Sequence, residues 1–233
     1  MTNNPHDQTA GTGDAGPAVS RPTDPPILDV SRETATAVFG DELDRAYTYA
    51  ELLAGAGVER GLIGPREVPR LWQRHLLNCA VIAELIPRDS DVLDIGSGAG
   101  LPGLPLAIAR PDIYVSLVEP MERRTTFLTE AVEALGLTNV DVVRARAEDV
   151  SPKGKADVVT SRAVAPLGRL AQWSLPLTRP GGLMLAIKGS SAADEVAATA
   201  KQLRRLRGTN PRVLRCGTDL LETPTTVIAI TRL

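Results

Sequence analysis

The chain is poor in the residues that build disulfide frameworks, metal centres and stacking surfaces. Its 233 residues include two cysteines and two histidines. Cys79 and Cys216 have neither the spacing of metal ligands nor that of a disulfide framework. Aromatic side chains make up 3% of the chain, too few for an RNA-binding sheet that stacks several bases on its rings. We therefore expect no metal site and no aromatic platform for nucleic acid.

Long apolar runs and a strong net charge are also missing. No stretch approaches the roughly 18 apolar residues that span a bilayer, and the N-terminus lacks a basic segment followed by an apolar one. We expect no membrane contact, no secretory signal and a cytoplasmic location. The formal net charge of −2 does not itself indicate a nucleic-acid partner, but it leaves room for a local basic face.

Composition and periodicity divide the chain into three parts. Residues 1–28 are rich in Gly, Pro, Thr and Asp and contain few large apolar side chains, which predicts a disordered tail. Residues 29–87 have the apolar spacing of helices, which predicts a helical block. We expect residues 88–233 to form a larger domain, and the helical block to pack beside it. The expected helices of the block cover about 31–40, 41–55 and 66–86.

Strands and helices alternate from residue 91 onward, which predicts a mainly parallel sheet with right-handed crossovers. The last two strands are joined by a short connection without a helix, so we expect an antiparallel hairpin at the sheet edge. The expected strands are Val92–Ile95, Tyr114–Val118, Val140–Arg144, Ala156–Thr160, Leu183–Ile187, Arg212–Arg215 and Thr225–Thr231, seven in all, with helices at about 103–110, 121–135, 166–178 and 191–207.

The most informative segment is Val92–Gly103, where an apolar strand is followed by four glycines within eight positions. Glycine tolerates positive φ and lets a ligand approach the backbone closely. The residues after the loop can begin a helix, whose first N–H groups attract anions and polar ligands. Strand, glycine turn and helix together are typical of the nucleotide crevice of a doubly wound α/β sheet.

Two patterns overlap in this loop. From Gly98 to Gly103 it matches G-x-G-x-x-G, the dinucleotide fingerprint, and Glu119 follows about 20 residues later. From Asp94 it reads D-x-G-x-G-x-G, the loop of methyltransferases that use S-adenosylmethionine (SAM). SAM carries an ammonium group that a carboxylate such as Asp94 can bind, so SAM is the favoured cofactor. A dinucleotide remains an alternative, as does a structural turn in which Asp94 braces the loop amides.

Several further motifs occur in a fixed order around this loop. They cover residues 61–67 (GLIGPRE), 72–78 (WQRHLLN), 123–124 (RR), 161–163 (SRA) and 187–189 (IKG). Together they resemble the RsmG (GidB) family of bacterial 16S rRNA guanine-N7 methyltransferases over nearly everything after the tail. Ala99 stands where the family often has proline, and Arg123 where lysine is common.

The resemblance implies a fold, a reaction and a partner. The fold is a class I SAM-dependent methyltransferase, with a Rossmann-like seven-stranded sheet, a terminal antiparallel hairpin and a small N-terminal helical block. The reaction is transfer of the SAM methyl group to N7 of a guanine, guanine 527 in the usual rRNA numbering. The partner is 16S rRNA, within the small ribosomal subunit or its precursor. A SAM sensor without catalysis, or a methyltransferase for a small molecule or protein, are the alternatives.

Cofactor contacts are expected at the loop and at the strand ends. Glu119 closes the second strand and can accept the ribose hydroxyls, or it is a solvated strand-end acid. Arg162 follows the fourth strand and can contact the SAM carboxylate or RNA phosphate, or it forms a surface salt bridge. The resemblance adds the backbone N–H of Leu101 and an adenine edge along Ala147 and Glu148. The expected cofactor residues are Asp94, Gly96, Gly98, Leu101, Glu119, Ala147, Glu148 and Arg162.

Guanine N7 has a lone pair and carries no proton, so we expect no general base. His75 lies in an apolar helical stripe and is either an interface histidine or part of the active site, which Asn78 would share from one turn further along. The active-site candidates are Arg162, His75 and Lys188, and the candidate RNA contacts are Arg123, Arg124, Lys188, His75 and Asn78, with Arg144 and Arg146 as further basic positions.

Overall fold

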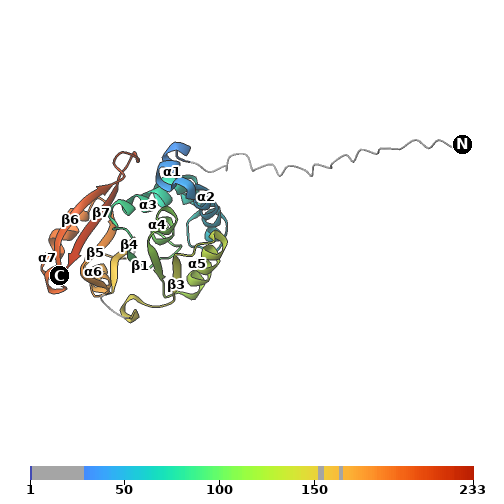
Figure 1. The fold of residues 1–233 in the computed structure, drawn as a ribbon. Helices are drawn as coiled ribbons and strands as arrows, with labels where there is room; N and C mark the ends of the chain where they lie inside the picture. The colour runs from blue at the N-terminus through green and yellow to red at the C-terminus, as the bar shows by residue number, and fades with distance from the viewer. Residues whose placement is uncertain (2–28, 152–154, 163–164) are drawn as a thin grey trace.

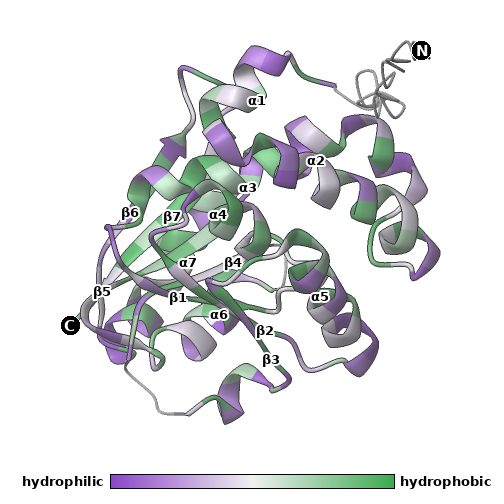
Figure 2. Ribbon diagram, turned by 45° about the vertical axis from the view of Figure 1, so that its right-hand side comes forward, coloured by the Kyte–Doolittle hydropathy of each residue, from purple (hydrophilic) through white to green (hydrophobic). Residues whose placement is uncertain are grey.

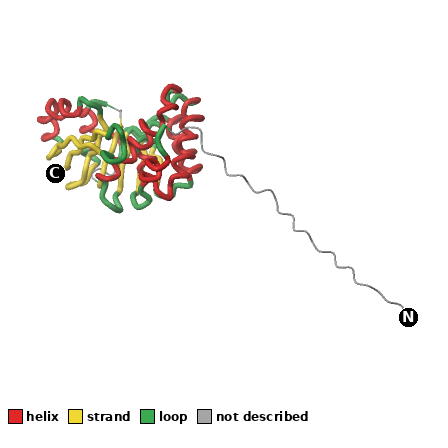
Figure 3. Tube along the Cα trace, turned by 90° about the horizontal axis from the view of Figure 1, so that it is seen from above, coloured by secondary structure: helices red, strands yellow, loops and turns green. Residues whose placement is uncertain are grey.

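The computed structural model describes residue 1 and residues 29–151, 155–162 and 165–233. The expected tail therefore lies outside the described residues, apart from Met1. Helices lie on both sides of a central sheet, as Figures 1 and 3 show. The N-terminal helices share one face of the sheet with α4 and α5, whereas α6 and α7 pack on the other.

The sheet has seven strands in the order β3-β2-β1-β4-β5-β7-β6. Strands β1 to β5 pair in parallel, and β7 is antiparallel to both of its neighbours. The predicted terminal hairpin is confirmed, with β7 inserted between β5 and β6. The strands are β1 Asp91–Ile95, β2 Tyr114–Val118, β3 Val140–Val143, β4 Ala156–Arg162, β5 Thr178–Lys188, β6 Gly208–Cys216 and β7 Thr225–Arg232.

The helices differ in length and type. None in the described part of the chain is long and apolar enough to cross a membrane. The α-helices are α1 Arg32–Phe39, α2 Leu43–Leu52, α3 Asn78–Ala80, α4 Gly103–Ala109, α5 Glu122–Leu135, α6 Leu167–Ser174 and α7 Ala192–Arg205. The 3-10 segments are η1 Gly40–Glu42, η3 Pro65–Arg70, η5 Val81–Leu85 and η6 Ala147–Asp149, and the π segments are η2 Leu53–Gly57 and η4 Trp72–Leu77.

Two predicted helices need correction. The long helix expected over 66–86 is a series of 3-10, π, α and 3-10 turns. Pro69 lies inside its first segment, where it has no N–H to donate and disfavours the α conformation of the preceding residue. The helix expected over 166–178 ends at Ser174, and β5 begins at Thr178 with an irregular register before Leu183.

The N-terminal block and the sheet share one hydrophobic core. Trp72 packs edge-on against Phe39 and Tyr47, with ring centroids 6.1 and 4.8 Å apart. Trp72 belongs to the same buried cluster as residues of α4 and of β1 and β2, and Figure 2 shows apolar residues on the strands and on helices that lie near them. Asn78 adds a polar tie, because its amide donates to the Thr225 hydroxyl on β7 (2.8 Å). The division into domains at about residue 87 stays a prediction.

A second polar tie holds α6 and α7 against the end of β5. The carboxylate of Glu195 in α7 accepts hydrogen bonds from the Lys188 ammonium (2.8 Å) and from the Leu167 N–H (2.7 Å). Lys188 also donates to the Ala165 carbonyl (2.9 Å), and its side chain is only 11% exposed. Burial alone would raise the pKa of Glu195, but the hydrogen bonds from Lys188 and Leu167 outweigh it and lower the pKa below its usual value.

We expect Glu195→Ala to lower the free energy of unfolding by about 1–3 kcal/mol, because it leaves a largely buried ammonium without its charged partner and a helix N–H without its acceptor. Asp194→Ala is the matched control, since it removes the same charge from the neighbouring exposed position. It should change stability by no more than about 0.5 kcal/mol. Urea denaturation followed by circular dichroism measures both. Equal losses in the two variants would contradict the structural role of this carboxylate.

Candidate active site

The loop between β1 and α4 is shaped by glycines in the left-handed region. The φ angles are +71° at Gly96, +59° at Gly98 and +98° at Gly100. A side chain is strained at such angles, and a Cβ at Gly100 would also lie 2.5 Å from the Leu104 side chain. The loop therefore leaves its backbone open to a ligand at the carboxyl end of β1.

Asp94 lies beneath this loop and is 0% exposed. Its Oδ2 accepts the Gly103 N–H at the start of α4 (3.0 Å). Oδ1 is buried without a hydrogen-bond partner in the described part of the chain, and burial raises the pKa of this carboxyl group to about 7. Asp94 does not line the cavity described below. Asp94 Oδ2 thus braces the start of α4, and the binding of a cofactor ammonium by this carboxyl group stays a prediction.

Glu119 follows β2 and faces the cavity with only 1% of its surface exposed. Its Oε2 accepts the Gly98 N–H (3.1 Å) and its Oε1 the Met121 N–H (3.0 Å). Arg124 approaches the same carboxylate at 3.4 Å. The alternative of a solvated strand-end acid is wrong. Because each carboxylate oxygen can accept two hydrogen bonds, Glu119 retains acceptor capacity toward the cavity.

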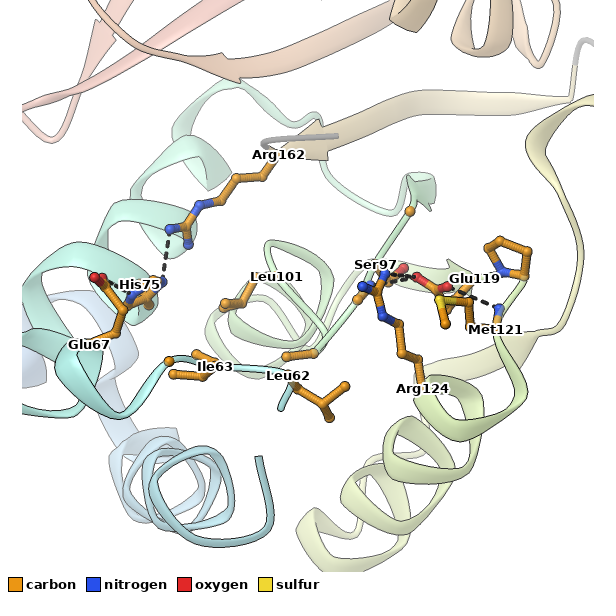
Figure 4. Close-up of a pocket in the computed structure, with 15 residues that line it drawn as sticks. Leu62, Ile63, Glu67, His75, Ser97, Leu101, Glu119, Met121, Arg124 and Arg162 are labelled. Carbon is orange, nitrogen blue, oxygen red and sulfur yellow. Dashed lines mark hydrogen bonds and ion pairs between the residues drawn. The ribbon is translucent and has the colours of Figure 1, made fainter. Parts of the chain in front are cut away.

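The cavity lies between the glycine loop, the ends of β2 and β4, and the N-terminal block, and has a volume of about 610 Å³. Figure 4 shows two polar groups at its sides, Glu67–His75–Arg162 and Glu119–Arg124, with the apolar side chains of residues 62, 63 and 101 between them. A second cavity of about 280 Å³ adjoins it, since Gly96 and Pro120 line both. Volumes of this size suit a small-molecule cofactor.

A chain of hydrogen bonds forms one side of the larger cavity. The Arg162 guanidinium donates to His75 Nδ1 (2.8 Å) and to Cys79 Sγ (3.2 Å). His75 Nε2 lies 2.9 Å from the Glu67 carboxylate, and the histidine is buried, with 8% of the residue's surface exposed. The expected alternative for Arg162, a surface salt bridge, is wrong, because its partners are a buried histidine and a buried thiol.

The electrostatics of this chain favour a neutral ring beside an ionised carboxylate. Burial, and then the charge of Arg162, lower the pKa of His75 below its usual value. The hydrogen bond from His75, together with the charges of Arg74 and Arg70, lowers the pKa of Glu67. His75 is therefore uncharged near neutral pH, whereas Glu67 is charged.

The second cavity contains the residues expected at adenine. Ala147 and Glu148 line it, together with Arg146 and Trp173. The Trp173 indole N–H donates to the Glu148 carboxylate (2.6 Å). Sequence reasoning missed Trp173, because no motif marks it.

Other predicted residues lie differently from what the sequence suggested. Leu101 lines the cavity, but its N–H donates to the Ser97 carbonyl (3.0 Å), so the expected free N–H is not available. Lys188 and Asn78 do not line the cavity; Lys188 pairs with Glu195 and Asn78 bonds to Thr225, as described above. Their assignment to the active site is therefore not supported by this geometry.

The arginine pair at the start of α5 is divided between two environments. Arg124 lines the cavity beside Glu119 and is 36% exposed, whereas Arg123 faces outward. Sequence reasoning also missed Glu67, which lines the cavity from η3, although it stands in the motif at 61–67. Its only sequence signal was that motif, and the motif does not say where the carboxylate points.

The residues present fit SAM. A glycine-rich backbone cradle lies beside the buried Glu119 carboxylate in the larger cavity, which provides space for a ribose and an amino-acid chain, and the adjoining smaller cavity provides space for an adenine. Solved structures with this fold include M. jannaschii TYW2 in complex with AdoMet (TM-score 0.55, 17% identity, 68% of this chain and 76% of that one). A SAM-dependent methyltransferase from Aquifex aeolicus is also similar (TM-score 0.53, 20% identity, 71% and 94%). Fold and site together define the class of Rossmann-like, SAM-dependent methyltransferases.

The family within that class follows from sequence relatives. Residues 42–221 match the family described as rRNA small subunit methyltransferase G (GidB). The chain is 56% identical over 223 residues to ribosomal RNA small subunit methyltransferase G of Salinispora tropica, covering 93% of this chain and 91% of that protein. It is 59% identical over 207 residues to the protein of that name from Kineococcus radiotolerans, covering 88% and 81%. The chain belongs to this family, as the sequence motifs predicted.

The raised pKa of Asp94 predicts a pH-dependent stability. In the unfolded chain this carboxyl group ionises near pH 4, whereas in the folded protein it keeps its proton up to about pH 7. Its contribution to the free energy of unfolding therefore falls as pH rises from about 4 to 7, by an amount on the order of 4 kcal/mol. Asp94→Asn keeps an acceptor for the Gly103 N–H but cannot ionise.

Urea denaturation of both proteins at a series of pH values measures this effect. The stability of Asp94→Asn relative to the native sequence should increase as pH rises through this window and level off above it. A stability difference that does not change between pH 4 and 7 would show that Asp94 titrates normally.

Proposed function

We propose that this chain transfers the methyl group of SAM to N7 of a guanine in 16S rRNA, guanine 527 in the usual rRNA numbering. The substrate is the small ribosomal subunit or its precursor, and the reaction takes place in the cytoplasm. The observation that carries the proposal is membership of a family whose relatives bear the name ribosomal RNA small subunit methyltransferase G, at 56% identity over 93% of this chain. The cavity between the glycine loop and the N-terminal block supports it.

The chain's own residues divide the binding of SAM between the two cavities. Glu119, at the end of β2, would accept the ribose hydroxyls beside the glycine loop. Ala147 and Glu148 would border the adenine in the smaller cavity, where Trp173 holds the Glu148 carboxylate. Arg162 would bind the carboxylate of the amino-acid chain, because its guanidinium lines the larger cavity beside His75 (Figure 4).

SAM supplies a methyl carbon that is already electrophilic because it is bonded to a sulfonium. Guanine N7 has a free lone pair, so the protein need not remove a proton. This agrees with His75, whose Nδ1 is occupied by the Arg162 guanidinium. The contribution of the protein is orientation of the reactants and exclusion of water by the apolar wall of Leu62, Ile63 and Leu101.

The charge that develops on the base also restricts where arginines can act. Methylated guanine is cationic, so a guanidinium directed at N7 would oppose the reaction. The arginines therefore serve the cofactor carboxylate and the RNA phosphates. Arg70 and Arg74 are 52% and 58% exposed, and both contact Glu67, which places them at the edge of the cavity.

Purified protein incubated with labelled SAM and either 30S subunits, naked rRNA or total protein tests the function. We expect label in 16S rRNA, and N7-directed strand scission should place it on a guanine. A single product at guanine 527 would support the full proposal. Label on adenine, cytosine, protein or a small molecule would overturn it, and SAM binding without transfer would indicate a sensor.

RNA binding should depend on exposed arginines near the start of α5. Arg123 is exposed, and Arg144, which follows β3, is 56% exposed beside Glu122. Because the chain has few aromatic side chains that could stack on bases, we expect it to recognise RNA through phosphate contacts and RNA shape. Arg123→Gln with Arg144→Gln should weaken RNA binding and reduce the slope of log K against log salt by roughly 1.4–1.8.

The matched control carries Arg204→Gln with Arg205→Gln, two exposed positions at the end of α7 on the other face of the sheet. It loses the same charge and should keep the RNA affinity and the salt slope. Filter binding at several salt concentrations measures both, and calorimetry verifies that SAM affinity is unchanged. Equal effects of the two double variants would refute a localised RNA interface.

A further inference from the structure

Glu67 and His75 form a support behind Arg162 that the proposed reaction does not by itself require. The three side chains come from η3, η4 and β4, and they meet at one side of the larger cavity (Figure 4). We propose that Glu67 and His75 are positioning residues, which hold the Arg162 guanidinium in the orientation that binds the carboxylate of SAM. This inference rests on the proposed function.

The hydrogen-bond pattern determines the state of the histidine. An arginine can only donate, so His75 Nδ1, 2.8 Å from Arg162, must be the acceptor and cannot carry a proton. The proton of the neutral ring is therefore on Nε2, which donates to the Glu67 carboxylate at 2.9 Å. Glu67 thus selects the tautomer whose free nitrogen faces Arg162.

The carboxylate is itself held in place by other groups. Its Oε1 accepts a hydrogen bond from Arg70 and its Oε2 forms an ion pair with Arg74, both at 3.1 Å, in addition to the hydrogen bond from His75. Glu67 is 24% exposed, whereas the His75 side chain is 11% exposed. The support therefore extends from the edge of the cavity inward to the buried ring.

Fixing a guanidinium matters because a free arginine side chain loses much rotational entropy when it binds a ligand. His75 and Cys79 constrain two of its nitrogens from one side. The remaining N–H groups of the planar fork then keep one orientation toward the cavity. A SAM carboxylate can bind them with little further loss of entropy.

The first arm of the experiment measures SAM affinity by calorimetry for the full chain and three variants. Glu67→Ala removes the acceptor of the His75 N–H and should weaken SAM binding about tenfold. Glu67→Gln keeps an amide oxygen for that N–H but loses the charge, and should recover most of the affinity. Glu42→Ala is the matched control: Glu42 also pairs with an arginine three residues along, is 26% exposed and does not line the cavity. It should bind SAM normally.

The second part of the experiment measures the affinity for SAM as a function of pH. The charged groups that face the His75 ring are Arg162 from β4, Glu67 from η3 and Arg74 from its own segment. Protonation would turn Nδ1 into a donor and break its bond to Arg162. SAM affinity of the native sequence should therefore fall as pH drops below the ordinary histidine range. His75→Asn places an amide oxygen near the position of Nδ1, so its affinity should lack this fall.

The outcomes separate the two proposals. If the native sequence does not bind SAM, the proposed function fails and this inference fails with it. If the native sequence binds SAM, any of three results overturns the positioning role alone. The first is that Glu67→Ala and Glu42→Ala bind SAM equally well, and the second is that Glu67→Gln binds SAM as weakly as Glu67→Ala. The third is that His75→Asn loses SAM affinity at low pH as the native sequence does. Thermal unfolding of each variant verifies that it is folded, and a variant of Glu67 that does not fold leaves the other to decide.

Discussion

The candidate site depends on the glycine loop between β1 and α4, which must keep one open conformation although it is rich in glycine and has few side chains that could hold it in place. Glycines lose more conformational entropy on folding than other residues, so groups outside the loop must hold it. Asp94 does so from β1 through the Gly103 N–H, and Glu119 does so from the end of β2. Tyr49, fully buried on α2, donates to the Ala99 carbonyl at 2.8 Å. Three separate elements thus converge on the same few peptide groups.

The last of these contacts explains why the N-terminal block is part of the site. The block shares its hydrophobic core with the sheet, and it supplies both the tyrosine beneath the loop and one wall of the cavity. Ile63, Glu67 and His75 all belong to that wall. A cofactor crevice at the end of a parallel sheet is open on one side, and here the block covers that side. Substrate access and cofactor binding are therefore linked to the packing of helices that precede the sheet in the chain.

Sequence reasoning predicted the sheet, its terminal hairpin, the glycine loop and the family, but it placed individual polar residues less well. Lys188 and Arg162 both end a strand at the same edge of the sheet, and both were expected as active-site candidates. The structure pairs Lys188 with Glu195 on α7 and directs Arg162 into the cavity. Asn78 and His75 are three positions apart on one helical path, yet Asn78 bonds to β7 and His75 faces the cavity. The sequence indicates at which edge of the sheet a charged strand-end residue lies. It does not indicate what the side chain contacts, because the partner comes from a segment that is distant in the chain.

The sequence by itself determined the features that short-range patterns encode: alternating strands and helices, the left-handed glycines after β1, and the motifs shared with the family. These depend on backbone conformation and on apolar periodicity over a few residues, which the local chain specifies. Only the tertiary structure decided which carboxylate braces the loop, which arginine enters the cavity and which tautomer His75 adopts. Arg162 and His75 are 87 residues apart in the chain, and a hydrogen bond between them exists only because packing of the N-terminal block against the sheet brings them within 2.8 Å.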